Sequence, residues 1–227
     1  MVFLDENAGK VHFALISRGL RCVSSSEIAD VCSYFHFSPS NVRATLVRKG
    51  ALVPLLFKGI FYVRSPEELL LKSLPSDPLL LASLACNKHL GKNWYFGLHT
   101  ALKFNDLAGV QAPVKSFIIT NRQLAPGKRK VGAMEFVFSQ IKHRSFDAGL
   151  VEKNGFRYSS PVRTSLDFLY FGIKKRDLSY ATLVLDAVLD KNRKKFVTLS
   201  GKLLGFYPVK KRMRVIIFEH LGGRYVL

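Results

Sequence analysis

Hydrophobic residues near the start of the chain recur at the spacing of an α-helix. This pattern predicts a first helix over residues 11–20, with its apolar residues on one face. A second, short helix is expected to start after Ser24 and to end near Cys32. Ser24 and Glu27 have the spacing of a capping box, in which each side chain bonds the backbone N–H of the other residue.

A third helix carries signals at both ends. Ser38 fits the N-cap position and Pro39 the first helical position, and Gly50 follows the expected end at Lys49. Because residues three and four apart share a helix face, the apolar side of this helix can be read directly from the sequence. That side consists of Val42, Thr45 and Leu46.

Two short β-prone runs follow the third helix, at residues 52–57 and 60–63. Lys58-Gly59 lies between them and is typical of a two-residue hairpin turn. Two helices, a turn, a capped helix and a hairpin follow one another in a winged helix-turn-helix domain. In that interpretation the third helix is the recognition helix, and Lys58-Gly59 is the tip of the wing.

Two proline-containing segments interrupt the pattern after the hairpin. They are Ser65-Pro66-Glu67-Glu68 and Leu74-Pro75-Ser76-Asp77-Pro78. We expect an exposed domain connection between them. The predicted domains are therefore a winged helix-turn-helix domain at residues 1–70 and a second domain at residues 71–227.

The second domain carries both helical and strand-like patterns. Asn154-Gly155 is typical of a tight hairpin turn, and residues 122–130 combine basic residues with proline and glycine, which indicates an exposed loop. The predicted fold class is α+β, with an N-terminal winged helix-turn-helix domain followed by a larger mixed α/β domain with a helical C-terminal tail. Predicted helices cover residues 78–90, 93–104, 160–171, 178–189, 196–204 and 213–221, and predicted strands cover 114–120, 135–138, 149–153 and 156–159.

The composition is that of a folded globular protein. Of 227 residues, 48% are hydrophobic and 22% are charged. The longest stretch without Asp, Glu, Lys or Arg has 12 residues, whereas a membrane-spanning helix needs roughly 20. The first residues lack the pattern of a secretory signal, and three cysteines do not indicate a disulfide scaffold. We therefore expect a cytoplasmic protein without a membrane partner.

The net charge of the chain indicates what kind of partner this globular protein binds. Lys and Arg number 35 against 16 Asp and Glu, a formal net charge of +19, which favours a polyanionic partner such as nucleic acid. A merely solvated basic surface is the alternative. The net charge is +2 for residues 1–70, +7 for 71–150 and +10 for 151–227. No acidic residue lies between Val31 and Pro66, the segment that contains the third helix and the hairpin.

The outward face of the third helix is the candidate DNA-reading surface. Arginine pairs with guanine and asparagine with adenine in the major groove, so these residue types suit base recognition. An ordinary solvated helix face is the alternative, which the lack of nearby acids disfavours. The predicted DNA-binding residues are Ser40, Asn41, Arg43, Ala44, Arg48 and Lys49, with Arg43 at the border of the face, and Lys58 at the wing tip.

Basic clusters near the C-terminus leave a second interpretation open, in which the protein binds RNA. Solvated helix ends explain such clusters equally well. The clusters are Lys191, Arg193, Lys194 and Lys195, and Lys210, Lys211, Arg212 and Arg214.

Searches for catalytic patterns find none. The six histidines do not stand at metal-ligand spacing with one another or with cysteine, and no phosphate-binding loop, dinucleotide fingerprint or nucleophile elbow occurs. We therefore predict no metal, no cofactor and no enzymatic activity. A nuclease or nucleotidyltransferase whose site is assembled only in space is the third alternative.

Three segments of the second domain resemble the antitoxin domain of AbiEi-type proteins. Residues 95–104, Tyr-Phe-Gly-Leu-His-Thr-Ala-Leu-Lys-Phe, are similar to the helix that opens that domain, although Asn105-Asp106-Leu107 replaces an expected Gly-Leu. Residues 117–122, Phe-Ile-Ile-Thr-Asn-Arg, resemble the following strand. Residues 160–167, Ser-Pro-Val-Arg-Thr-Ser-Leu-Asp, resemble the family's Ser-Pro-Glu-Arg-Thr-Leu-Leu-Asp, with Val162 and Ser165 as departures.

The resemblance implies an antitoxin of a type IV toxin–antitoxin pair that represses its own operon. Its partners would be the double-stranded DNA of its own promoter and a nucleotidyltransferase-like toxin, generally without a stable complex. Arg163, Thr164 and Asp167 match the family motif, and we expect them to be structural. A spacing of four residues permits a helix ion pair between Arg163 and Asp167, worth about 0.3–0.5 kcal/mol.

Overall fold

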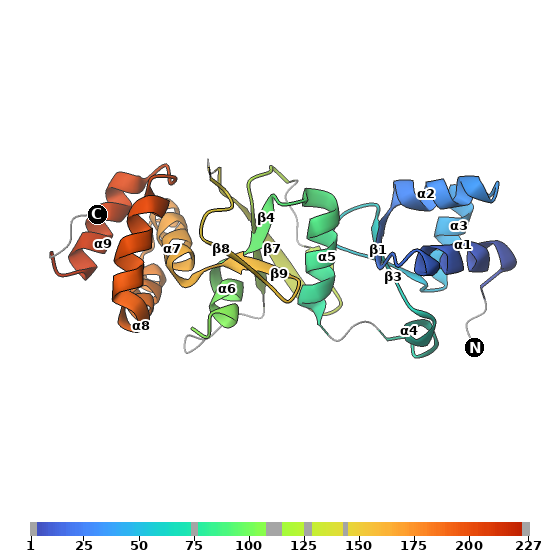
Figure 1. The fold of residues 1–227 in the computed structure, drawn as a ribbon, viewed down its shortest axis with the longest axis horizontal. Coiled ribbons are helices and arrows are strands. Elements are labelled where there is room, and N and C mark those ends of the chain that lie inside the picture. Colours follow the sequence, from blue (N-terminus) through green and yellow to red (C-terminus); the bar gives the residue numbers. More distant parts are fainter. Residues whose placement is uncertain (1–3, 74–76, 108–114, 125–128, 143–144, 224–227) are drawn as a thin grey trace. The chain divides into compact units, whose positions relative to one another are not determined.

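The computed structural model describes residues 4–73, 77–107, 115–124, 129–142 and 145–223. Helices and strands occur together throughout, so the predicted α+β class is confirmed (Figure 1). The chain forms two compact units. The first comprises Met1–Gly91 with Arg129–Met134, and the second comprises Lys92–Lys128 with Glu135–Leu227.

The first unit combines short helices with a small antiparallel sheet. Its strands lie in the order β1-β3-β2. The core contains apolar residues of the first three helices, among them Val11, Ile28 and Leu46, packed with Val63 of the sheet. The elements are α1 (Glu6–Ser17), β1 (Cys22–Ser24), α2 (Ser25–Tyr34), α3 (Pro39–Arg48), β2 (Leu52–Pro54), β3 (Ile60–Val63), α4 (Pro66–Leu70), α5 (Pro78–Leu90) and β6 (Arg129–Val131).

Local signals set the helix boundaries of this unit. The capping box at the start of α2 is confirmed: Ser24 Oγ accepts from the Glu27 N–H at 3.3 Å, and Glu27 Oε2 accepts from the Ser24 N–H at 2.9 Å. Helix α3 begins at Pro39 and ends at Arg48, before Gly50, whose φ is +77°. Helix α1 begins earlier than predicted, because the Asp5 side chain accepts from the Ala8 N–H at 2.7 Å.

The hairpin differs from the prediction in one strand. Strand β2 ends at Pro54 and not at Phe57, because residues 55–57 belong to the connection that returns the chain to β3, which the bond from the Leu55 N–H to the Ile60 carbonyl closes at 3.0 Å. Lys58 and Gly59 do occupy the centre of a turn, in which the Ile60 N–H donates to the Phe57 carbonyl at 3.1 Å. Strand β1 was not predicted. It pairs with β3 through Val23 opposite Phe61.

Helix α5 begins and ends where the sequence predicts, with the Asp77 side chain accepting from the Leu79 N–H at 2.8 Å. It packs against β1 and β3 and therefore belongs to the first unit. The compact units thus divide after Gly91, whereas the sequence places the domain boundary at residue 70. The boundary as a division between folding domains stays a prediction.

The second unit contains most of the remaining elements, and two helix predictions for it are wrong. Residues 94–96 form a strand and not a helix, because three buried aromatic residues pair with the next strand. The helices predicted at 178–189 and 196–204 are one helix, since no glycine or proline interrupts the charged segment between them. The elements are β4 (Trp94–Phe96), α6 (Leu98–Phe104), β5 (Ser116–Thr120), β7 (Met134–Gln140), β8 (Leu150–Lys153), β9 (Phe156–Ser159), α7 (Pro161–Lys175), α8 (Ser179–Leu204) and α9 (Lys210–His220).

Strands of this unit form a mixed sheet in the order β7-β5-β4-β9-β8. Strand β5 is parallel to β7 and antiparallel to β4, and β4 is parallel to β9. The predicted hairpin turn at Asn154-Gly155 is confirmed, with φ of +52° and +77° between β8 and β9. In the basic segment 122–130, Arg129 and Lys130 begin β6, and residues 125–128 lie outside the described residues.

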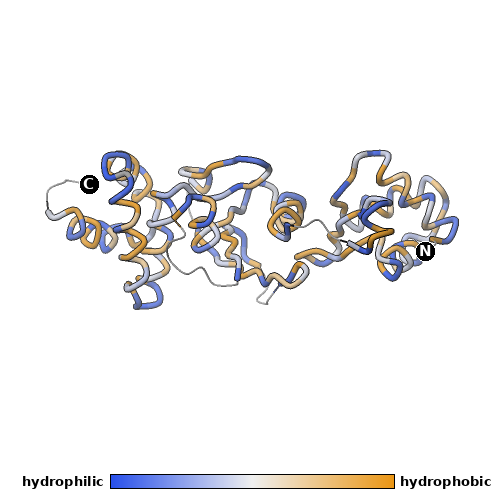
Figure 2. The backbone as a smooth tube through the Cα atoms, turned by 90° about the horizontal axis from the view of Figure 1, so that it is seen from below, coloured by the Kyte–Doolittle hydropathy of each residue, from blue (hydrophilic) through white to orange (hydrophobic). Residues whose placement is uncertain are grey.

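Helix α7 is central to the second unit. It packs against α6, β9, α8 and α9, and in Figure 1 it lies between the sheet and α8. Its residues Leu166 and Leu169 are fully buried. Hydrophobic and hydrophilic residues alternate along the helical turns at the C-terminal end, as amphipathic helices require (Figure 2). None of the helices within the described residues has the length and apolar character needed to cross a membrane.

Candidate nucleic-acid interface

Helix α3 turns one face to the core of the first unit and one face outward. Val42 and Leu46 are buried, as predicted, and Thr45 is half-buried. The predicted DNA-binding residues lie on the other side. Ser40, Asn41, Ala44, Arg48, Lys49 and Lys58 are exposed, and Arg43 is half-buried.

A groove of about 530 Å³ separates α3 from the turn of the β2–β3 hairpin. Four of the predicted residues line it together, whereas Ser40, Asn41 and Lys49 do not. The hydrophobic side chains of Val47 and Phe61 form part of its wall. The lining consists of Arg43, Ala44, Val47, Arg48, Lys58, Gly59 and Phe61. We call this site the α3–hairpin groove.

Ser25, at the start of α2, fixes the two sides of the groove. Its N–H donates to the Gly59 carbonyl at 2.8 Å, which ties α2 to the hairpin turn. Its hydroxyl accepts a hydrogen bond from Arg43 Nη1 at 3.2 Å. Gly59 has a φ of +80°, and a Cβ there would lie 3.0 Å from Ser25 Oγ. The close approach therefore favours glycine at this turn.

The electrostatic character of the groove is cationic. In the part of the chain that the structure describes, neither Arg48 nor Lys58 has an ion-pair partner. Glu27, an acidic residue of α2, is paired with Lys88 of α5. These contacts leave two side-chain positive charges of the groove free to meet an anionic ligand.

Sequence reasoning missed Ser25, Val47 and Phe61 as parts of this site. Val47 follows the buried Leu46 without being on the same face, and Phe61 belongs to a strand in which all four residues are buried. Ser25 carried only the signal of a helix start. Their roles depend on contacts between residues far apart in the sequence, which no local pattern reveals.

The motif residues of the second unit form a buried network. Arg163 and Asp167 are fully buried on α7 and lie close to Tyr95 and Tyr207. Asp167 accepts hydrogen bonds from the Tyr95 hydroxyl at 3.0 Å and from the Tyr207 hydroxyl at 2.6 Å. Arg163 donates to the Tyr95 hydroxyl at 3.1 Å and to the Phe146 carbonyl at 2.8 Å.

The simple helix ion pair that we expected between Arg163 and Asp167 is wrong. The Tyr95 hydroxyl bridges the two charges, because α7 is buried on this side and its polar groups must find partners in the interior. Burial raises the pKa of Asp167, and the Arg163 charge and the tyrosine hydroxyls oppose that rise. Thr164 is also buried and donates to the Ser160 carbonyl at 2.9 Å.

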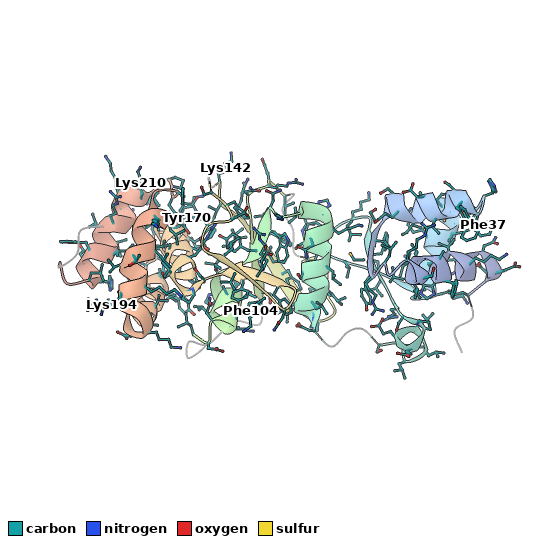
Figure 3. The ribbon with its side chains drawn as sticks, in the orientation of Figure 1. Phe37, Phe104, Lys142, Tyr170, Lys194 and Lys210 are labelled. Carbon is teal, nitrogen blue, oxygen red and sulfur yellow. The ribbon has the colours of Figure 1, made fainter. Side chains whose placement is uncertain are left out.

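The two basic clusters near the C-terminus do not form one patch. Lys194 of α8 and Lys210 of α9 point to opposite edges of the helical part of this unit (Figure 3). Every cluster residue is exposed, and Lys191 donates to the Asp106 carbonyl at 2.7 Å. A ligand that contacts both clusters would therefore have to wrap around the helices. Within the described residues, no group of three His, Cys, Asp or Glu side chains could hold a metal ion.

Comparisons with known proteins bear on the fold alone. No family model matches the chain, and no curated protein matches it. Among solved structures, it is similar to the crystal structure of the RV2827C protein from Mycobacterium tuberculosis. That match covers 99% of this chain and 84% of the other, with a TM-score of 0.57 and 15% sequence identity. The chain therefore shares an overall architecture with that protein.

Proposed function

We propose that the first unit is a winged helix-turn-helix module that binds double-stranded DNA. The observation that carries the proposal is the α3–hairpin groove, where Arg48 of α3 and Lys58 of the hairpin tip flank a common surface and have no acidic partner among the residues that the structure describes. Strand β1, helices α2 and α3, and the β2–β3 hairpin also follow one another in the order that such modules use.

In this proposal α3 enters the major groove and the hairpin tip contacts the sugar–phosphate backbone. Recognition helices contact bases mainly through their N-terminal residues, which assigns Ser40 and Asn41 to base edges. Arg48 and Lys49, at the other end of α3, then contact phosphates. The apolar wall at Val47 and Phe61 suits the deoxyribose rings between the phosphates, since it offers no polar group to hydrate.

The antitoxin role rests on the resemblance to AbiEi-type proteins. We propose that the protein represses the promoter of its own operon and opposes a nucleotidyltransferase-like toxin. The test is co-expression with a neighbouring gene of that type. If the neighbouring product arrests growth and this protein does not relieve the arrest, the antitoxin role is wrong, whereas DNA binding is unaffected.

Titration of the full chain against its own promoter tests the DNA proposal directly. Ala44→Glu places a negative charge in the α3–hairpin groove and should abolish binding. Leu70→Glu adds the same charge at an exposed position of α4 and serves as the matched control. Equal weakening by both variants would overturn the proposed interface. Tighter binding of a transfer RNA than of any duplex would favour the RNA interpretation instead.

A further inference from the structure

A second concave site lies entirely within the second unit, between α6, β5, α7 and the start of α8. It is a pocket of about 220 Å³. Pockets that accept drug-sized ligands measure roughly 300–1,000 Å³, so this one suits a single ring system. Its lining includes Leu98, Phe117, Phe168, Phe171 and Tyr180, which are hydrophobic, and His99, Lys175 and Asp177, which are polar.

Aromatic rings form half of the lining, with His99 counted among them. The His99 ring centroid lies 5.4 Å from that of Phe117, 5.1 Å from that of Phe168 and 4.7 Å from that of Tyr180. Phe171, on the next turn of α7, is half-buried. Planar rings around a small cavity favour a planar aromatic ligand, because stacked rings contact each other over the whole ring face.

A polar group in the wall can form a hydrogen bond with a polar atom at the edge of an aromatic ligand. His99 Nδ1 and the Tyr180 hydroxyl are 3.1 Å apart and share a hydrogen bond. Among the residues that the structure describes, the other ring nitrogen, Nε2, has no hydrogen-bond partner. Burial and the positive charge of Lys175 lower the pKa of His99, so the ring is neutral at physiological pH. A neutral ring leaves Nε2 able to bond a polar ring atom.

One basic side chain lines the pocket, that of Lys175 at the end of α7. Its neighbours Lys174 and Arg176 are also exposed but are not part of the lining, and Lys174 Nζ lies over the Tyr170 ring, 5.1 Å from the ring centroid. Asp177 also lines the pocket, and its carboxylate accepts from the Ser179 N–H at 3.1 Å and from the Ser179 hydroxyl. These hydrogen bonds and the Lys175 charge lower the pKa of Asp177, so its negative charge persists and Lys175 is the lining group that would have to hold an anion against it.

Two residues at the pocket adopt backbone conformations that non-glycine residues rarely use. Leu98, in the lining, has a φ of +50°, and Arg176, between Lys175 and Asp177, has a φ of +60°. Left-handed residues of this kind cost free energy and often occur where a binding site needs a particular geometry. A Cβ at Gly172 would lie 2.7 Å from the Asp177 carbonyl, so the turn that holds Lys175 and Asp177 requires glycine there.

We propose that this pocket binds one nucleobase, with the attached 5′-phosphate on Lys175. The rings of Phe117, Phe168 and Phe171 enclose the base, and His99 bonds its polar edge. A free nucleotide and an unstacked nucleotide of a single strand offer the same chemistry. The site is independent of the α3–hairpin groove, and its failure would leave the DNA proposal untouched.

Calorimetric titration of the full chain with the four ribonucleoside 5′-monophosphates tests the pocket. We expect saturable binding in the millimolar range or tighter. Ribose 5-phosphate lacks the base, and phenyl phosphate has a ring without a hydrogen-bonding edge, so both should bind at least about fivefold more weakly. Equal binding of either compound, or no saturable binding of any nucleotide, would overturn the proposal.

Two pairs of variants locate the ligand. Phe171→Leu should weaken nucleosides and nucleotides by about fivefold or more, whereas Phe206→Leu, also half-buried but outside the pocket, should not. Lys175→Gln should weaken nucleotides and leave nucleosides unchanged, whereas the neighbouring Lys174→Gln should change neither. If the control variants act as strongly as the pocket variants, the ligand binds elsewhere and the proposal is wrong.

Short single-stranded RNA distinguishes the two sources of the base. If an oligonucleotide binds about tenfold more tightly than its mononucleotide and depends on Phe171, the pocket receives an unstacked base of a strand. If the two bind alike with the same dependence, the pocket serves free nucleotides. Both results support the pocket as a nucleobase site, and binding of the strand without dependence on Phe171 argues against it.

Discussion

Arg43 of α3 donates a hydrogen bond to the hydroxyl of Ser25, the first residue of α2, at 3.2 Å. The same serine bonds the hairpin turn through its backbone N–H. The Arg43 guanidinium is therefore held within the α3–hairpin groove, whereas the Arg48 side chain is exposed. The two arginines, which the sequence places five residues apart on one helix, thus have different freedom to reach DNA.

Substitutions of these two partners should separate charge from positioning. If Arg43 contacts a phosphate from its place in the groove, Arg43→Ala should lower the slope of log affinity against log salt by about 0.9. Ser25→Ala keeps the charge and removes the hydroxyl, which accepts from Arg43 at 3.2 Å and donates to the Gly59 carbonyl at 3.4 Å, so affinity should fall with the slope unchanged. Titration of one duplex at several salt concentrations measures both. Equal slopes for parent and Arg43→Ala would mean that Arg43 does not meet a phosphate.

Asn41 and Arg48 should show different signatures on the protein's own promoter. Asn41→Ala should cost about 1–3 kcal/mol on the cognate site and little on random DNA, because a base contact carries sequence information. Arg48→Ala should weaken both duplexes alike, as loss of a phosphate contact does. Both side chains are exposed, so the melting temperature should change by no more than about a degree or two.

Footprinting and titration on that promoter measure these effects. If both variants bind the promoter as the parent does, α3 is not the reading element. The winged-helix interpretation of the first unit then loses its functional basis, even though the fold is unchanged.

Local signals were sufficient to predict much of the first unit. The capping box at Ser24 and Glu27 and the proline at position 39 act within a few residues, and the structure follows them. The buried face of α3 follows from helical spacing, because Val42 and Leu46 lie four residues apart. The hairpin turn depends on Gly59 alone, which adopts the positive φ that the turn needs.

Contacts between distant segments account for what the sequence did not reveal. Strand β1 has only three residues, and pairing with β3 is what makes it a strand. Trp94–Phe96 is likewise a strand only through pairing. Its partner in β5 lies more than twenty residues away, so the local pattern predicted a helix there instead. The α3–hairpin groove and the pocket beside His99 likewise combine residues from separate elements, so no single periodic pattern contains them.

The buried network of α7 should behave as one energetic unit. Arg163→Met leaves the Asp167 carboxylate buried without its countercharge and should destabilise the second unit by about 3–5 kcal/mol. Asp167→Asn in the same background should cost much less than it does alone. The double variant should therefore be more stable than the sum of the single changes predicts, by about 0.5–3 kcal/mol.

Trp94 provides the probe for this cycle, because it is the one tryptophan of the chain and is fully buried in the second unit. Urea unfolding followed through its fluorescence reports that unit. Additive effects of the two substitutions would show that Tyr95 does not couple the charges. Arg48→Ala, in the other unit, is the control and should leave this transition unchanged.

His12 should make the stability of the first unit depend on pH. Its ring is buried, with Nε2 2.8 Å from the Arg64 carbonyl, and burial lowers its pKa. The folded state therefore binds a proton less readily than the unfolded state, whose histidine pKa is about 6.5. The stability that His12 contributes is present above that pH and is lost as the pH falls through the folded pKa.

His12→Gln keeps an N–H donor for Arg64 but cannot titrate. Amide hydrogen exchange of β3 at about pH 7.5 and about pH 5.5 should thus show a larger loss of opening free energy in the parent than in the variant. His99→Gln, in the second unit, is the control and should leave the pH dependence of β3 as in the parent. If the parent and His12→Gln lose the same free energy over this range, His12 is not the group that titrates.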